Sequence, residues 1–331
     1  KREKDNVHKC YMLRQPFKQP VRKLLFFDFE TDQSSGVHLP VYCFIQWVVL
    51  AQNDLTGEDE IVESGEKDFG INYSVFKDVG KFIFQQKFSE FTCIAHNLKG
   101  FDGCFLLRYL IEEGIHVELI ANGLKLTSIY VPQFEIRMID SLNFLQMRLG
   151  DMPKTLGIEH IVRAKGYFPH FFTSPTNLTY RGQIPPPEFY GCYDLKDKQY
   201  ETFLTWYNKT VETNTEFDFP KELKLYCRQD VEILKEGCLK FRNLMISITK
   251  QIPSQPNCLD DEIKVTEDRK NQPINPEIDD PFEGTIDEKQ SDCFDSEGSC
   301  DPFAYLTAPG VCSAIYKAKF LFGLLFISLN V

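Results

Sequence analysis

Four acidic residues lie in segments where a globular fold would otherwise place apolar side chains. Asp28 and Glu30 end the apolar run Leu24–Glu30, two residues apart. In a strand this spacing puts both carboxylates on one face, because side chains alternate across the strand. Neighbouring carboxylates repel each other unless a cation lies between them, and hard oxygen ligands suit Mg²⁺ or Mn²⁺. A strand end that emerges into solvent would carry the same acids, so this pair alone leaves both interpretations open.

Asp102 and Asp230 are the other two acids. Asp102 follows the turn-like Asn97–Gly100 and Phe101, close to an expected helix start, where an Asp can also act as a cap. Asp230 falls within the apolar stripe of a helix expected over Pro220–Ile248, and Tyr226 one turn earlier shares its face. A buried, unpaired carboxylate is unfavourable, and either metal ligation or a buried salt bridge can offset this.

Regular elements are expected on both sides of these acids. Buried strands are predicted first, then helices, and this order indicates an α/β domain with a mixed sheet flanked by helices. The residues between the second strand and the first helix are expected to form a polar connection, and 141–190 a Pro- and Gly-rich one. The predicted strands are Leu24–Glu30, Val41–Leu50, Phe91–Ala95, Val117–Ile120, Lys125–Val131 and Glu135–Asp140, and the predicted helices are Val75–Gln86, Phe101–Glu113, Lys196–Val211 and Pro220–Ile248.

Composition excludes fibrous and disulfide-scaffold classes. Hydrophobic residues make up 43% of the 331 residues and charged residues 26%, as in globular proteins. The 11 cysteines are odd in number and form no C-x-x-C pair, which indicates reduced thiols. The net charge of −11 is concentrated in residues 258–301, which hold 15 of the 48 acids and 4 of the 37 bases. The rest of the chain is balanced, so net charge does not exclude a nucleic-acid partner.

These patterns divide the chain into four parts. We predict a basic N-terminal arm at 1–23, an α/β domain at 24–250, an acidic disordered linker or insertion at 251–301, and an ordered piece at 302–331. The apolar end Phe320–Val331 is too short to span a bilayer. We expect an intracellular, unsecreted protein with no membrane partner.

Taken together, the acid-bearing segments resemble the three exonuclease motifs of family B DNA polymerases. The matching strings are Phe-Asp-Phe-Glu-Thr at 27–31, His-Asn-Leu-Lys-Gly-Phe-Asp at 96–102, and Tyr-x-x-x-Asp at 226–230. The resemblance implies an RNase H-like 3′–5′ exonuclease fold with a four-carboxylate site of the DEDDy type.

Two further strings resemble the protein-primed branch of that family. Asp-Ser-Leu-x-x-Leu at 140–145 is similar to its Ser/Thr-Leu-x-x-hydrophobic motif, which contacts single-stranded DNA and the terminal protein. Lys165-Gly-Tyr-Phe168 is similar to its Lys-x-x-hydrophobic motif, whose lysine supports the exonuclease site. Within this branch of linear plasmids, viruses and Polinton (Maverick) transposons, the chain looks most like the Polinton group. A eukaryotic transposon or virus as source would imply a nuclear location.

The resemblance implies a role for each matching residue. Two Mg²⁺ or Mn²⁺ ions would act at the site, and the partners would be single-stranded DNA, the primer terminus and a terminal protein. The implied metal ligands are Asp28, Glu30, Asp102 and Asp230. The implied catalytic residues are these four acids with Tyr226 and Lys165, and the implied DNA-binding residues are Asn97, Phe101, Ser141, Leu142 and Phe168. Phe101 and Leu142 could also be core residues, and Lys165 a solvated loop residue.

The family's polymerase-half motifs are absent from these 331 residues. We therefore expect an exonuclease-domain portion followed by the truncated start of a polymerase domain, without primer extension. The alternatives are a free-standing DEDDy exonuclease acting on RNA or DNA, and a catalytically silent, transposon-derived module that binds DNA or terminal protein.

Overall fold

The computed structural model describes residues 9–12, 15–122, 125–163, 165–213, 216–252, 298–320 and 325–328. The chain divides into two compact units, Val21–Asn243 and a second unit formed by Lys1–Pro20 with Leu244–Val331. The candidate residues all lie in the first unit. The predicted linker falls mostly on residues 253–297, outside the described residues.

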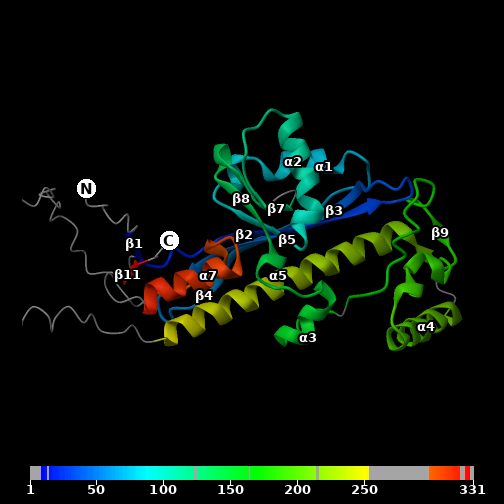
Figure 1. Cartoon of the computed structure of the whole chain (residues 1–331). Helices are drawn as coiled ribbons and strands as arrows, with labels where there is room; N and C mark the ends of the chain where they lie inside the picture. The colour runs from blue at the N-terminus through cyan, green and yellow to red at the C-terminus, as the bar shows by residue number, and fades with distance from the viewer. Residues whose placement is uncertain are drawn as a thin grey trace, which may run out of the picture. The chain divides into compact units, whose positions relative to one another are not determined.

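A seven-stranded mixed sheet forms the centre of the first unit (Figure 1). Its order is β4-β3-β2-β5-β8-β7-β6, in which β2, β5 and β8 are parallel and the other neighbours antiparallel. The antiparallel meander β2-β3-β4 beside two parallel strands is the RNase H-like arrangement, so the expected fold class is confirmed. The strands are β2 (Lys23–Asp32), β3 (Leu39–Gln52), β4 (Asp59–Asp68), β5 (Thr92–Ala95), β6 (Glu118–Asn122), β7 (Lys125–Val131) and β8 (Ile136–Asp140).

Helices cover both faces of this sheet. The helices α1 (Val75–Ile83) and α2 (Asp102–Glu112) lie on one face and α5 (Phe219–Gln251) on the other (Figure 1). Strand β2 is buried on both faces, as its continuous apolar run requires. Leu25, Phe27 and Phe29 pack into the core formed with α1 and α2. Asp28 and Glu30 therefore point to the opposite face, toward α5.

The carboxyl ends of the parallel strands bring the motifs together. The end of β5 pairs with the end of β8, with Ala95 opposite Asp140. The chain segments that leave β2, β5 and β8 therefore begin at one edge of the sheet. Ligand sites in α/β sheets form at this edge.

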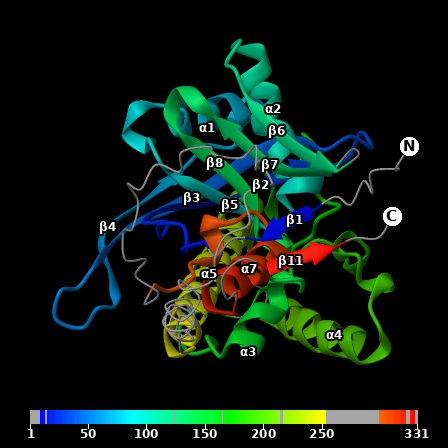
Figure 2. The same cartoon turned by 60° about the vertical axis from the view of Figure 1, so that its left-hand side comes forward.

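The prediction of a polar connection after the second strand is wrong. Residues Asp59–Asp68 form strand β4, which pairs antiparallel with β3 (Figure 2). Most of its side chains are exposed because β4 is the edge strand of the sheet, where charged residues discourage pairing with another chain. A strand with no buried face leaves no apolar alternation in the sequence.

The long connection between β8 and α5 has little regular structure. It contains α3 (Met152–Leu156), α4 (Asp197–Glu212) and a short ladder of β9 (Arg181–Gly182) with β10 (Phe217–Asp218). Tyr190, Cys192 and Phe203 form a small hydrophobic cluster here. The predicted helices Lys196–Val211 and Pro220–Ile248 correspond to α4 and α5, whereas α3, inside the predicted Pro- and Gly-rich connection, was not predicted.

The second unit contains β1 (Lys9–Met12) paired antiparallel with β11 (Leu325–Ser328), and the helix α7 (Ala308–Ile315). The Cys300 amide donates a hydrogen bond to Thr249 Oγ1 at 2.8 Å. Asp301 caps the short turn that follows it, through the Phe303 amide. No helix among the described residues is both long and apolar enough to cross a membrane.

Candidate active site

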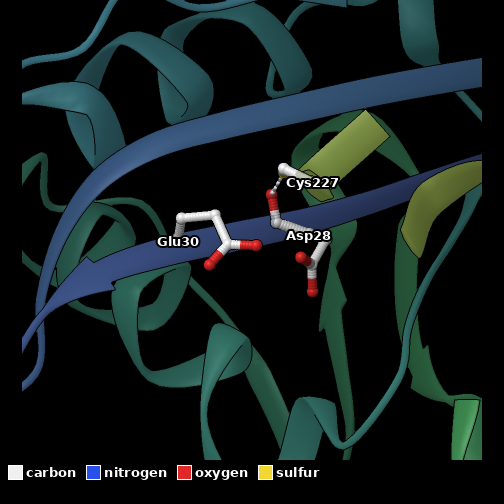
Figure 3. Close-up of side chains that lie close together, drawn as sticks. All are labelled: Asp28, Glu30 and Cys227. Atoms are coloured by element: carbon white, nitrogen blue, oxygen red, sulfur yellow. Dashed lines mark hydrogen bonds between the residues drawn. The ribbon is translucent and has the colours of Figure 1, made fainter. Parts of the chain in front are cut away.

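Strand β2 supplies the first two carboxylates. Asp28 and Glu30 lie on the same side of the strand, and α5 brings Cys227 next to them (Figure 3). The Cys227 thiol donates to the Asp28 carbonyl at 3.3 Å. One ligand atom from each of the three residues lies within 4.8 Å of the other two, so the group could hold a metal ion. Carboxylate pairs of this kind suit hard divalent cations.

Asp102 is the first residue of α2, and its side chain is almost fully buried. Its Oδ1 accepts a hydrogen bond at 3.0 Å from the amide of Phe29, which lies between Asp28 and Glu30 in β2. The second predicted motif is therefore hydrogen-bonded directly to the first. The position agrees with the predicted helix start, but the carboxylate also fixes the helix to the strand.

Asp230 reaches the site from α5 and is 5% exposed. Its Oδ2 forms a salt bridge of 2.7 Å with Lys165 Nζ. Its Oδ1 is buried and has no hydrogen-bond partner among the described residues. The salt bridge left open by the sequence is thus present, but it satisfies only one of the two oxygens. A buried acceptor without a partner is costly unless a cation or water binds there.

Tyr226 lies one turn before Asp230, on the same face of α5. Lys165 Nζ lies 4.7 Å from the centroid of its ring. The Phe168 ring stacks on it with a centroid separation of 5.0 Å. The Tyr226 hydroxyl lies 3.3 Å from His170 Nε2. Burial raises the pKa of this phenol, and Asp230, Glu30 and Asp28 raise it further, so Tyr226 stays protonated at neutral pH.

The electrostatics of the site show an excess of negative charge. Burial raises the pKa of Asp28, and the charges of Asp102, Glu30 and Asp230 add to this. Burial, followed by repulsion from Asp230, raises the pKa of Glu30 in the same way. Burial raises the pKa of Asp102 to about 7, although the Phe29 amide opposes the shift. A cation bound between these buried acids would relieve their mutual repulsion.

Lys165 offsets part of this repulsion. Burial lowers its pKa, but Asp230, Asp28 and Glu30 outweigh that effect and raise it overall. The lysine lowers the pKa of Asp230 against the larger effect of burial, so the carboxyl's pKa stays raised. The alternative of a solvated loop lysine does not fit this ion pair, although the role of Lys165 in catalysis stays a prediction.

The loop after β5 carries the predicted DNA-binding residues Asn97 and Phe101. Asn97 is exposed and has the left-handed backbone conformation, with φ of 67°. The Phe101 ring is partly buried and packs edge-on against His38, with centroids 4.6 Å apart. An exposed amide and a partly exposed ring at the sheet edge could both reach a nucleic-acid strand.

A buried carboxylate fixes that loop to the end of β8. Asp140 Oδ1 accepts from the amides of Asn97 and Leu142, and its Oδ2 from the amide of Lys99. Beside it, His96 Nδ1 and the Ser141 hydroxyl lie 2.8 Å apart. The segments predicted to bind DNA are therefore held side by side through Asp140.

Burial limits how three of the predicted DNA-binding residues could contact DNA. Ser141 is fully buried and bonded to His96, and Phe168 is 3% exposed and stacked on Tyr226. Leu142 is partly exposed. A direct contact of any of these residues with DNA stays a prediction, and burial favours a supporting role for Ser141 and Phe168.

Three residues of the site were missed from sequence. Cys227 adjoins Tyr226, but nothing in the pattern distinguishes its thiol from other core cysteines. Asp140 enters the sequence analysis only as part of the Ser-Leu motif, although Asp is a favoured capping residue and here caps the turn Ser141–Asn143. His170 lies 56 positions from Tyr226 in the chain, so the sequence gives no sign of their contact.

The structure combines an RNase H-like sheet with four acids clustered on β2, α2 and α5, and comparison with known proteins gives the family. The family described as DNA polymerase type B, organellar and viral, matches residues 85–320, so this chain belongs to that family.

Two relatives, each named a probable DNA polymerase, are similar to parts of the chain. The one from Ascobolus immersus is 28% identical over 171 residues, which cover 49% of this chain and 13% of the relative. The one from Agaricus bitorquis is 29% identical over 144 residues, which cover 40% of this chain and 17% of the relative. The chain therefore matches only a small part of these relatives' length.

Two solved structures are also similar. Phi29 DNA polymerase in complex with primer-template DNA and incoming nucleotides has 14% sequence identity and a TM-score of 0.37, over 75% of this chain and 39% of that one. The family B DNA polymerase of the archaeon Pyrobaculum calidifontis has 14% sequence identity and a TM-score of 0.33, over 73% of this chain and 30% of that one.

Proposed function

We propose that this chain is the exonuclease portion of a family B DNA polymerase and removes nucleotides from 3′ ends of single-stranded DNA. The observation that carries the proposal is the meeting of Asp28, Glu30, Asp102 and Asp230, from β2, α2 and α5, at the carboxyl edge of one sheet. All four are carboxyls with raised pKa values. Family membership supports DNA as the substrate.

The donor set fits two divalent cations such as Mg²⁺ or Mn²⁺. The unpartnered Oδ1 of Asp230 and the close carboxylates of Asp28 and Glu30 supply oxygen ligands, and Asp102 completes the set. When bound, the ions would activate water and stabilise the leaving 3′ oxygen. The four carboxylates would hold the ions, and burial keeps the acids from relaxing into solvent.

The remaining side chains would orient the reactants. Tyr226, a neutral phenol, would hydrogen-bond the attacking water without giving up its proton. Lys165 would balance the charge of the scissile phosphate from its position beside Asp230. Asn97, Phe101 and Leu142 would hold the frayed end, with Ser141 and Phe168 supporting them.

The finer assignment is to the protein-primed branch, with the Polinton group as the most similar. It rests on the Ser141-Leu142 and Lys165 strings, and on the connection of the first string to the Asn97 loop through Asp140. A terminal protein would then be a further partner.

The test is digestion of a 5′-labelled single-stranded oligonucleotide by the purified chain with Mg²⁺ or Mn²⁺. We expect stepwise shortening from the 3′ end that EDTA stops. Asp28→Ala and Asp230→Ala should each lower turnover by at least about a hundredfold, because each removes a metal ligand. DNA binding in Ca²⁺ should persist in both variants.

Activity that survives EDTA, or that proceeds from the 5′ end, would rule out this mechanism. A preference for RNA over DNA would favour the free-standing exonuclease instead. Strand binding without any hydrolysis would favour the silent binding module.

A further inference from the structure

The phenol of Tyr226 is enclosed by side chains from one short segment, Lys165–His170. The ring contacts Lys165 and Phe168, while the hydroxyl faces His170. The imidazole of His170 also meets the Tyr226 ring edge-on at 5.2 Å and the Phe168 ring at 5.5 Å. These contacts fix the plane of the imidazole as well as its distance from the hydroxyl.

The backbone that carries His170 is anchored to the catalytic strand. Thr173 Oγ1 donates to the His170 carbonyl at 3.1 Å and accepts from the Gln33 amide at 3.2 Å. Gln33 directly follows β2, the strand of Asp28 and Glu30. The position of His170 is therefore defined relative to the carboxylates, and not only relative to Tyr226.

The charge state of the imidazole suits it to accept a proton in a hydrogen bond. Burial, with a smaller effect of Lys165, lowers the pKa of His170 to about 4, so the ring is neutral at pH 7. A neutral imidazole has one nitrogen that accepts and one that donates. The Tyr226 hydroxyl has a single proton, and its direction decides where the lone pairs of its oxygen point.

We propose that His170 is a positioning residue for Tyr226: its Nε2 accepts a hydrogen bond from the phenol hydroxyl and so directs the lone pairs of the phenol oxygen toward the attacking water. The inference rests on the proposed exonuclease function, because that function requires a water at Tyr226. His170 itself need not touch the substrate, the metal ions or the water.

A double-mutant cycle tests this coupling. His170→Asn removes the nitrogen at the Nε2 position, since the shorter amide reaches only the place of Nδ1. We expect it to lower kcat about five- to tenfold with little change in KM, as for the loss of one oriented hydrogen bond. Tyr226→Phe should lower kcat by at least that factor. In the Tyr226→Phe background, His170→Asn should have no further effect, within about twofold.

A conservative variant separates positioning from packing. His170→Gln places its amide oxygen near the position of Nε2, so it should restore most of the activity lost in His170→Asn. His160→Asn, which alters an exposed histidine, is the matched control and should leave kcat unchanged. Melting temperatures of all variants would show whether the fold persists. If His170→Asn does not fold, His170→Leu, which also removes the acceptor but keeps a side chain of similar size, takes its place in the cycle with Tyr226→Phe.

Independent effects of the two substitutions on kcat, or equal losses in His170→Asn and His170→Gln, would overturn this inference while the exonuclease proposal stands. A wild-type protein without any nuclease activity would overturn both.

Discussion

Replacing Asp102 by Asn should stabilise the metal-free protein at alkaline pH while it damages the site. The carboxylate is 2% exposed, and burial raises its pKa from 3.8 to about 7. A carboxyl with a raised pKa binds its proton more tightly in the folded state than in the unfolded state. Its contribution to stability is therefore fully present below the unfolded pKa and is lost as pH rises through about 7.

The magnitude follows from the two pKa values. A shift of this size corresponds to about 4 kcal/mol of lost stability at pH 8, and to about 2–3 kcal/mol between pH 5 and pH 8. The asparagine oxygen can still accept from the Phe29 amide, so the substitution removes the charge and keeps that hydrogen bond. We expect the variant's melting temperature to exceed that of the wild type by about 5–10 °C at pH 8, and by less than half of this at pH 5.

The assay is thermal unfolding in EDTA across this pH range, for wild type and variant together. The difference in melting temperature between wild type and variant removes the effect of the other groups that titrate, because these are the same in both proteins. Added Mg²⁺ should stabilise the wild type, by about 2.7 kcal/mol at a hundred times its dissociation constant, and the variant less.

The matched control is Asp140→Asn, the same substitution at another buried aspartate. Its two oxygens accept from three backbone amides, and an asparagine would turn its NH₂ group toward the Lys99 amide. We expect this variant to lose about 1–3 kcal/mol of stability at pH 8, opposite in sign to Asp102→Asn. A loss of stability in Asp102→Asn at pH 8, similar to that in Asp140→Asn, would refute the reasoning.

Three further outcomes are expected. Lys165→Met should destabilise the metal-free protein by about 2 kcal/mol, because it leaves Asp230 without its ion-pair partner. Lys224→Met, at the exposed pair with Asp68, should destabilise it by less than about 1 kcal/mol, and unfolding in EDTA compares the two variants. Asn97→Ala should raise KM for single-stranded DNA more than it lowers kcat, and a pure kcat effect would contradict a DNA-holding role. Because Asp230 is a proposed metal ligand and Tyr226 is not, Asp230→Ala should reduce metal binding measured by calorimetry while Tyr226→Phe leaves it unchanged.

The carboxylates could be predicted from sequence because they interrupt apolar segments. Asp28 stands among phenylalanines and Asp230 within an apolar stripe, and such exceptions are informative when the surrounding residues are otherwise uniformly apolar. The strands of the sheet interior were predicted from these apolar segments themselves. Strand β4 was not, since an exposed edge strand has neither a buried face nor an alternating pattern.

The supporting residues could not be predicted because their function depends on contacts between distant segments. His170 meets Tyr226 across 56 positions of the chain, and Asp140 meets Asn97 across 43. No periodicity relates such pairs. Lys165 was predicted only through a family resemblance, since its pairing with Asp230 spans 65 positions.

In the part of the chain that the structure describes, Lys165 is the lysine paired with an acid of the site. Among the described residues, the charge of Lys165 compensates part of the repulsion between the four acids, and a bound divalent cation would relieve the rest. A second lysine in contact with Asp28 or Glu30 would relieve the repulsion in the metal-free protein, but it would also compete with the ions for the same oxygens. The raised pKa values arise chiefly from burial, and for Asp28 and Glu30 also from the charges of the neighbouring acids. The large apolar core on the opposite face of β2 supplies the stability that this arrangement requires.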